Sequence, residues 1–201
     1  LLRAASQQEI DQMKQLLKED LKEGSFGLST GLEYESAFYS TRDEVLQLAA
    51  VVAAFKGRYI SHIRSEDITM SDALDEIIDI GRKTKIPVQI SHIKLAKKGD
   101  WGKAQEIIKQ LEMARKEGID ITADVYPYNF WNSTPRVLFP KRDYNNIGSA
   151  KFATEELFDP SQSYLVKFAA QKDYEAKTLS EIAQIRKETE AQTLMNLIQL
   201  S

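Results

Sequence analysis

The chain has 201 residues, of which 42% are hydrophobic and 28% charged, a balance typical of a globular protein with a sizeable core. Its net charge is −3, with lysine and arginine dispersed among aspartate and glutamate, so we expect no nucleic-acid partner and no membrane-surface partner. Cysteine is absent, which excludes disulfides and thiolate ligands and leaves nitrogen and oxygen to bind any metal.

The start of the chain, Leu1-Leu2-Arg3, does not resemble a signal peptide, and no apolar run reaches the roughly eighteen residues of a membrane span. We therefore expect a chain that begins within a longer protein. The compartment stays open between cytoplasmic and periplasmic, because a targeting segment would precede this start.

Up to about residue 126, helical spacing of apolar residues alternates with short apolar runs typical of strands. Ser6, Thr41 and Ser71 stand where N-caps are expected, and Gly118 follows the last of these helices. The expected order is helix 7–23, strand 26–32, helix 42–55, strand 58–63, helix 71–83, strand 88–93, helix 102–116 and strand 119–126.

The pattern weakens over residues 132–177, where prolines and polar turns predict an irregular excursion with one short helix near 150–158. A further helix is expected to begin at Thr178 or Ser180, and the last one at Glu188-Thr189.

One phrase, Ile-Ser-His-Ile followed by a cation, occurs at residues 60–63 and again at 90–93. Its histidines, His62 and His92, are the only two in the sequence and are thirty residues apart, the length of a strand–helix–strand unit. Neighbouring parallel strands would bring both imidazoles to one edge, where they are suited to bind zinc or a similar metal. The alternative is a pair of buried histidines that bind backbone groups.

Alternating strands and helices predict a parallel sheet with right-handed crossovers, and polar chemistry at the strand ends favours a barrel over an open nucleotide-binding sheet. A closed eight-unit barrel needs about 250 residues. We therefore predict an α/β fold for residues 1–201: about four parallel strands of a TIM (β/α)8 barrel, an incomplete barrel carrying the excursion at 132–177.

Other polar residues stand near the same expected edge. Asp124 is suited to act as an acid or base, or to orient a neighbouring loop. Arg64 is a candidate to bind an anion, although an ion pair with Glu66 or Asp67 is the simpler expectation.

The chain resembles the D-aminoacylase (N-acyl-D-amino-acid deacylase) family of the amidohydrolase superfamily, nearly from end to end. The resemblance is carried by several phrases in the same order. They are Gly-Leu-Ser-Thr-Gly-Leu-Glu-Tyr at 27–34, the two histidine phrases, Trp-Gly-Lys at 101–103, Asp-Val-Tyr-Pro-Tyr at 124–128, Ser-Thr at 133–134 and Tyr-Glu-Ala-Lys-Thr-Leu at 174–179.

The resemblance implies a zinc-dependent barrel enzyme, with one or two ions, that cleaves the linear amide of N-acyl-D-amino acids, a C–N bond other than a peptide bond. It implies that His62 and His92 bind zinc and that Tyr34 and Lys94 bind the substrate carboxylate. A surface ion pair for Lys94 and core packing for Tyr34 remain the alternatives.

Three aromatic residues, Tyr126, Tyr128 and Trp131, are candidates to line the pocket for the acyl group, with core packing as the alternative. The family's His-X-His pair, a further Cys or Glu ligand and its general-base Asp have no counterpart here. The resemblance places the Asp beyond Ser201. No catalytic residue is therefore assigned within the chain, which we expect to be an internal segment, inactive alone and weak in metal binding.

Three other functions remain open. A cyclic amide hydrolase of the dihydroorotase or hydantoinase kind would share the histidines, whereas a Schiff-base barrel would use Lys94 as its nucleophile. The third is a non-catalytic fragment or interaction module. The acyl group, the preferred side chain, the metal count and the oligomeric state are not fixed by the sequence.

Overall fold

The computed structural model describes residues 2–201, so Leu1, part of the expected mid-protein start, lies outside the described residues. The chain divides into two compact units, each described here by itself. The first comprises residues 2–95 and Gly102–Asn129, and the second comprises Ala96–Trp101 and Phe130–Ser201. None of the helices within residues 2–201 is long and apolar enough to cross a membrane.

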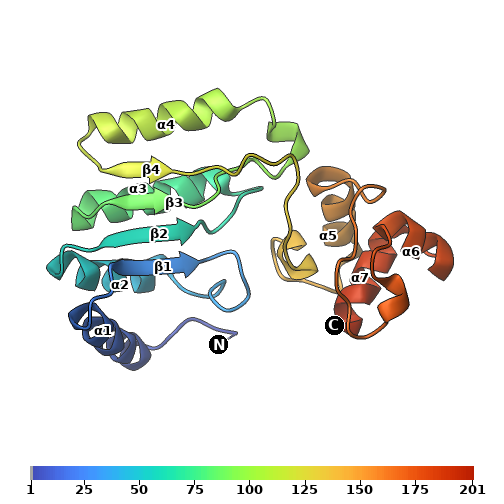
Figure 1. Ribbon diagram of the computed structural model, residues 1–201, viewed down its shortest axis with the longest axis horizontal. Helices are drawn as coiled ribbons and strands as arrows, with labels where there is room; N and C mark the ends of the chain where they lie inside the picture. The colour runs from blue at the N-terminus through green and yellow to red at the C-terminus, as the bar shows by residue number, and fades with distance from the viewer. Residues whose placement is uncertain (1) are drawn as a thin grey trace. The chain divides into compact units, whose positions relative to one another are not determined.

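The first unit is built on a parallel sheet of four strands in the order β1-β2-β3-β4, so each strand pairs with the next along the chain (Figure 1). A helix separates each strand from the next, as expected for a barrel segment. The elements are α1 (Gln7–Lys22), β1 (Gly27–Gly31), α2 (Arg42–Ala54), β2 (Arg58–His62), α3 (Met70–Thr84), β3 (Val88–Ile90), α4 (Ala104–Lys116) and β4 (Ile121–Ala123).

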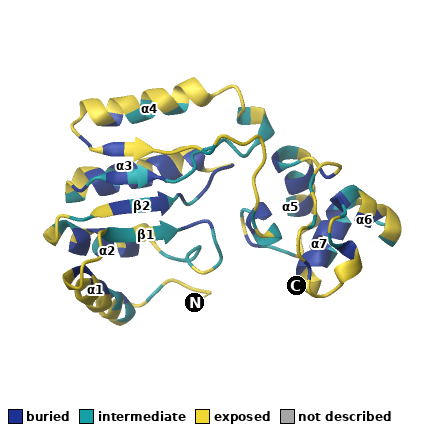
Figure 2. Cartoon of the chain, in the orientation of Figure 1, coloured by how far each residue is buried: buried dark blue, intermediate teal, exposed yellow. Residues whose placement is uncertain are grey.

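Burial alternates along β2 and β3, so their successive side chains lie on two different faces of the sheet (Figure 2). Tyr59, Val88, Ile90 and Ile121 are almost fully buried in one cluster with apolar side chains of α2 and α3. Their alternate neighbours, such as Gln89 and Thr122, are half-buried or exposed. The helix-covered face is therefore the core of this unit.

The helix starts follow local hydrogen bonds. Ser6 and Glu9 form a capping box at α1, and the Thr41 hydroxyl accepts from Glu44 N at α2, as predicted. Ser71 is not the cap of α3, which begins one residue earlier, after Thr69. The Ser65 hydroxyl accepts from Thr69 N at 3.2 Å and so satisfies an amide at this start.

The third and fourth strands are shorter than predicted. β3 ends at Ile90, two residues before His92, and β4 spans three residues. The backbone φ of His92 is 41°. This value lies in the left-handed region, which a residue of an extended strand does not adopt. The prediction that His92 lies inside a strand was therefore wrong, although Ser91 N still donates to Ser61 O at 2.9 Å.

The second unit contains the expected excursion and the final helices around its own apolar core. Thr178 and Thr189 cap the last two helices, consistent with the predicted starts. The segment near 150–158 is α-helical and then π-helical. The elements are η1 (Lys98–Asp100), η2 (Pro135–Leu138), α5 (Ile147–Phe152), η3 (Ala153–Leu157), η4 (Lys172–Tyr174), α6 (Leu179–Arg186) and α7 (Glu190–Leu200).

Candidate metal centre

The two histidines meet at the edge of the sheet to which its strands point. His62 is the last residue of β2, and His92 follows β3 by two residues. His62 Nδ1 lies 3.1 Å from His92 Nε2, with the ring centroids 4.7 Å apart and the planes at 69°. One nitrogen of each ring thus faces the other, as the repeated phrase predicts.

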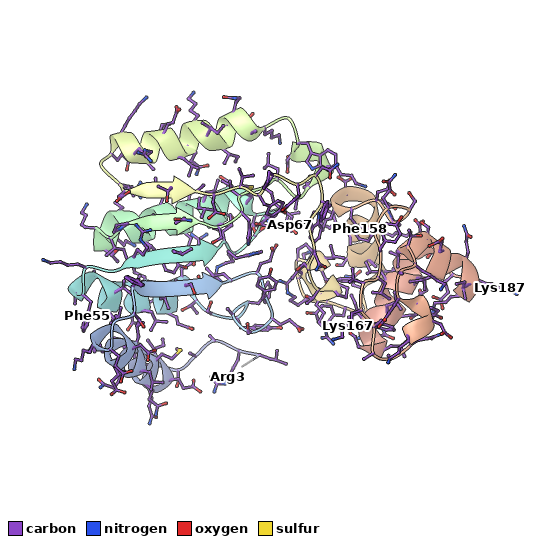
Figure 3. The ribbon with its side chains drawn as sticks, in the orientation of Figure 1. Arg3, Phe55, Asp67, Phe158, Lys167 and Lys187 are labelled. Carbon is purple, nitrogen blue, oxygen red and sulfur yellow. The ribbon has the colours of Figure 1, made fainter. Side chains whose placement is uncertain are left out.

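Carboxylates approach the histidines from two segments. Glu33, two residues after β1, places Oε2 2.7 Å from His62 Nε2. Glu66, in the loop after β2, places Oε1 3.2 Å from His92 Nδ1. Figure 3 labels Asp67, the next residue of this loop, on the side of the sheet to which the strands point.

The donor set fits a metal ion. Two ligands each about 2.0–2.1 Å from one zinc ion lie about 3.3 Å apart in tetrahedral geometry, close to the observed nitrogen separation. Ligand atoms of His62, Glu66 and His92 all lie within 4.8 Å of one another. Two imidazoles and a carboxylate make three protein ligands, the number typical of a catalytic zinc site.

Burial shapes the electrostatics of this centre. It lowers the pKa of His62, an effect opposed by Glu66 and reinforced by the Lys94 charge. Burial also raises the pKa of Glu66, although Lys94 and His62 act in the opposite direction. A lowered histidine pKa favours the neutral imidazole, which is the form that binds a metal.

Lys94 contacts Glu66 and His92. Its Nζ lies 2.6 Å from each Glu66 carboxylate oxygen and 2.9 Å from His92 Nδ1. The same ammonium lies 5.7 Å from the centroid of the Tyr126 ring. Lys94 is therefore paired with a buried carboxylate beside the histidines, and its ion pair is not a surface one.

Tyr34 lies against the first histidine. Its ring centroid is 4.7 Å from that of His62, with the planes at 50°. A Cβ on Gly31 would meet the Tyr34 ring at 2.8 Å, so a glycine at this position lets the ring lie over the strand end. Tyr34 is thus half-buried at the centre and not part of the apolar core.

Asp124 acts on the backbone of the second histidine. Its Oδ1 accepts from His92 N at 2.6 Å, and its Oδ2 accepts from Gln89 Nε2 at 2.6 Å. The contacts match the alternative in which Asp124 orients a neighbouring loop, and they hold the left-handed backbone of His92 in place.

Arg64 does not pair with Glu66 or Asp67, so that prediction was wrong. Its guanidinium binds Glu76 of α3 through two bonds of 2.7 and 2.8 Å and donates to Ser40 O at 2.8 Å. The physical reason is that the Arg64 side chain points toward α3, where the carboxylate of Glu76 is almost fully buried and requires a charged partner.

The aromatic candidates differ in their surroundings. Tyr126 lies with its ring centroid 6.4 Å from that of His92, and Tyr128 lies 6.3 Å from Tyr126. Tyr128 is 64% exposed, and Trp131 belongs to the second unit, where it is 41% exposed. Neither Tyr128 nor Trp131 belongs to an apolar core cluster of the described residues, so core packing does not account for them.

Sequence reasoning missed the place of Glu66 at this centre. The sequence indicates Glu66 only as a partner for Arg64, because nothing in the spacing of the loop after β2 shows which way its side chains point. The signal that was present is its position, four residues after His62 in a loop at the carboxyl end of a strand.

Comparison with family models gives no match. Curated relatives do match: the N-acyl-D-glutamate deacylase of Alcaligenes xylosoxydans xylosoxydans is 34% identical over 130 residues, 65% of this chain and 26% of that protein. The D-aminoacylase of the same organism is 36% identical over 130 residues, 64% of this chain and 26% of that protein. The chain thus spans about a quarter of the length of these relatives.

Solved structures of similar proteins also match this chain. A crystal structure of D-aminoacylase superposes with a TM-score of 0.80 and 26% identity, covering 98% of this chain and 38% of that one. An N-acyl-D-glutamate deacylase from Bordetella bronchiseptica, complexed with zinc and a phosphonate inhibitor, gives a TM-score of 0.81. At 23% identity, with 98% of this chain and 38% of that one covered, it supports the fold alone.

Fold and site together define a class: a segment of a parallel α/β barrel with imidazoles and carboxylates clustered at the carboxyl ends of its strands. The comparisons then show what this segment is similar to. The chain is similar to D-aminoacylase and to related N-acyl-D-amino-acid deacylases, and its four strands match a segment of the barrel domain in D-aminoacylase structures, as the sequence predicted.

Proposed function

We propose that the chain is an internal segment of a zinc-dependent amidohydrolase that cleaves the linear amide bond of N-acyl-D-amino acids. The observation that carries the proposal is the pair of facing nitrogens, His62 Nδ1 and His92 Nε2, 3.1 Å apart at the ends of neighbouring parallel strands. The relatives that share this segment are named for deacylation of N-acyl-D-amino acids.

In this proposal His62 and His92 hold the ion, and Glu66 is the third ligand that the chain supplies. A zinc ion bound there would polarise the scissile carbonyl and acidify water. D-aminoacylase is described as having a binuclear metal centre, so a second ion in the longer enzyme is consistent with the family. The general base and the other ligands would come from outside this chain.

Tyr34 and Lys94 are placed to bind the substrate carboxylate. Both lie beside the histidines, Tyr34 as a phenol donor and Lys94 as a cation. Lys94 is already held by Glu66, so its ammonium is oriented before substrate arrives. Tyr126, with its ring centroid 5.7 Å from the Lys94 ammonium, lies beside this proposed carboxylate site.

No observation favours the other functions over this one. A Schiff-base enzyme needs a neutral amine as nucleophile, whereas both oxygens of a buried carboxylate hold the Lys94 ammonium. A cyclic amide hydrolase would use the same histidines, so substrate tests must separate it. A non-catalytic module would not need the ligand geometry that these residues have.

The test compares hydrolysis of N-acetyl-D-amino acids and of hydantoins by the longer enzyme and by its His62→Ala/His92→Ala variant. We expect release of the free D-amino acid by the parent enzyme, no comparable hydantoin opening, and loss of activity in the variant. Preferential hydantoin opening would favour the cyclic amide function, and activity unaffected by the double substitution would contradict the metal role.

A further inference from the structure

Glu33 contacts the ring nitrogen of His62 that faces away from the other histidine. Its Oε2 lies 2.7 Å from His62 Nε2, whereas His62 Nδ1 points toward His92. Glu33 is itself almost fully buried, at 9% exposure, and its Oε1 lies 3.5 Å from Glu66 N. The carboxylate is therefore held between the end of β1 and the loop after β2.

The chemistry of this contact fixes where the proton of His62 resides. A carboxylate accepts hydrogen bonds, so the bond requires the proton on Nε2. The lone pair of the neutral ring then lies on Nδ1, the nitrogen directed at His92. The contact at the other nitrogen favours the same tautomer. His92 Nδ1 lies 2.9 Å from the Lys94 ammonium, which can only donate, so His92 carries its proton on Nε2 and donates it to His62 Nδ1.

We propose that Glu33 is the positioning residue of this centre: it selects the Nε2-protonated tautomer of His62, fixes the ring and so presents Nδ1 to the metal. This inference rests on the proposed metal site. A carboxylate behind a ligating imidazole raises the basicity of that ligand, and loss of such a partner typically costs 10–100-fold in metal affinity.

The backbone shows why Glu33 stands there. Leu32 N donates to His62 O at 3.0 Å, which continues the pairing of β1 with β2 beyond Gly31. Leu32 is 3% exposed, so the next residue along the chain starts from an anchored position beside the end of β2. Its carboxylate thereby reaches His62, and Tyr34 packs on the same ring.

The first test is nitrogen-15 NMR of the two histidine rings in the metal-free chain. With two histidines in the sequence, a His92→Asn variant assigns the signals of His62. We expect a protonated Nε2 and an unprotonated Nδ1 in the parent chain and in His92→Asn, and a shift toward the Nδ1-protonated form when Glu33→Leu is added to His92→Asn, which lacks the imidazole that faces Nδ1. An unchanged tautomer in that double variant would overturn the proposal.

The second test is zinc affinity by calorimetric titration of the chain. We expect Glu33→Leu to weaken binding by about 10–100-fold. Glu33→Gln keeps an oxygen acceptor without the charge, so it should weaken binding less than Glu33→Leu, and it serves if Glu33→Leu does not fold. Glu112→Gln, an exposed change on α4, is the matched control and should bind as the parent does.

The two proposals fail in different ways. If the parent chain binds no zinc, the proposed metal site is contradicted, while the tautomer measurement still tests Glu33. If the parent binds zinc and both Glu33 variants bind it equally well, the role of Glu33 is wrong and the metal site stands.

Discussion

Each histidine of the centre is held by a carboxylate, but by a different route. Glu33 binds the ring of His62, whereas Asp124 binds the main-chain nitrogen of His92. The repeated phrase predicted that both histidines lie at this centre, because the same local sequence recurs at the strand ends of two successive strand–helix units. It could not predict Glu66, since the fold and not the spacing brings that loop residue beside His92.

Asp124→Ala should weaken zinc binding with a small effect on folding. The left-handed backbone of His92 loses its acceptor, so the second imidazole is less well placed, and we expect about a 10-fold loss of affinity. The lost hydrogen bonds should cost about 1 kcal/mol of unfolding free energy. Calorimetric titration checks the affinity, with Asp120→Ala, exposed just before β4, as the control. Equal zinc affinities in Asp124→Ala and Asp120→Ala would contradict this role of Asp124.

Lys94→Gln should raise KM for an N-acyl-D-amino acid more than it lowers kcat in the longer enzyme. The reason is that the ammonium is proposed to bind the carboxylate, which does not change during the reaction. Steady-state kinetics with the substrate and with its carboxamide analogue measure this role. If the variant loses as much activity on the carboxamide as on the acid, Lys94 acts through Glu66 and not through the substrate.

At the scale of elements, helix starts were easier to predict than strand ends. Ser6 and Thr41 cap their helices as expected, because a cap depends on side chains a few residues away. The ends of β3 and β4 depend on the neighbouring strand and on Asp124, which lies more than thirty residues from the His92 amide it binds. Such contacts leave no local periodicity in the sequence.

The bond between Arg64 and Glu76 joins the end of β2 to α3. Glu76 is 4% exposed and the Arg64 side chain 21%, so Glu76→Gln leaves a largely buried guanidinium without its charge partner. We expect a loss of about 3 kcal/mol in the free energy of unfolding. Urea denaturation measures it, with Glu106→Gln on the exposed face of α4 as control. A midpoint shift no larger than that of the control would show that the pair is dispensable.

At the scale of the whole molecule, the alternation of strands and helices predicted the parallel sheet and its order. Residues 132–177 of the second unit were expected to form an irregular excursion, because most of their apolar residues follow no helical or strand period. Phe139, Leu157, Phe168 and Tyr174 nevertheless join α6 and α7 in one core. Residues far apart in sequence assemble this core, and composition alone does not show their contacts.

The central claim is that this chain carries the ligands of a metal ion in His62, Glu66 and His92. The most direct measurement is the zinc content of the chain after equilibration with zinc and removal of unbound metal, compared with the His62→Ala/His92→Ala variant. The sequence, with two histidines alone, predicted weak binding; because Glu66 adds a third ligand, we now predict about one zinc ion per parent chain and almost none in the variant, with the same far-ultraviolet circular dichroism in both. Equal zinc in the two proteins, or none in the parent, would contradict the account.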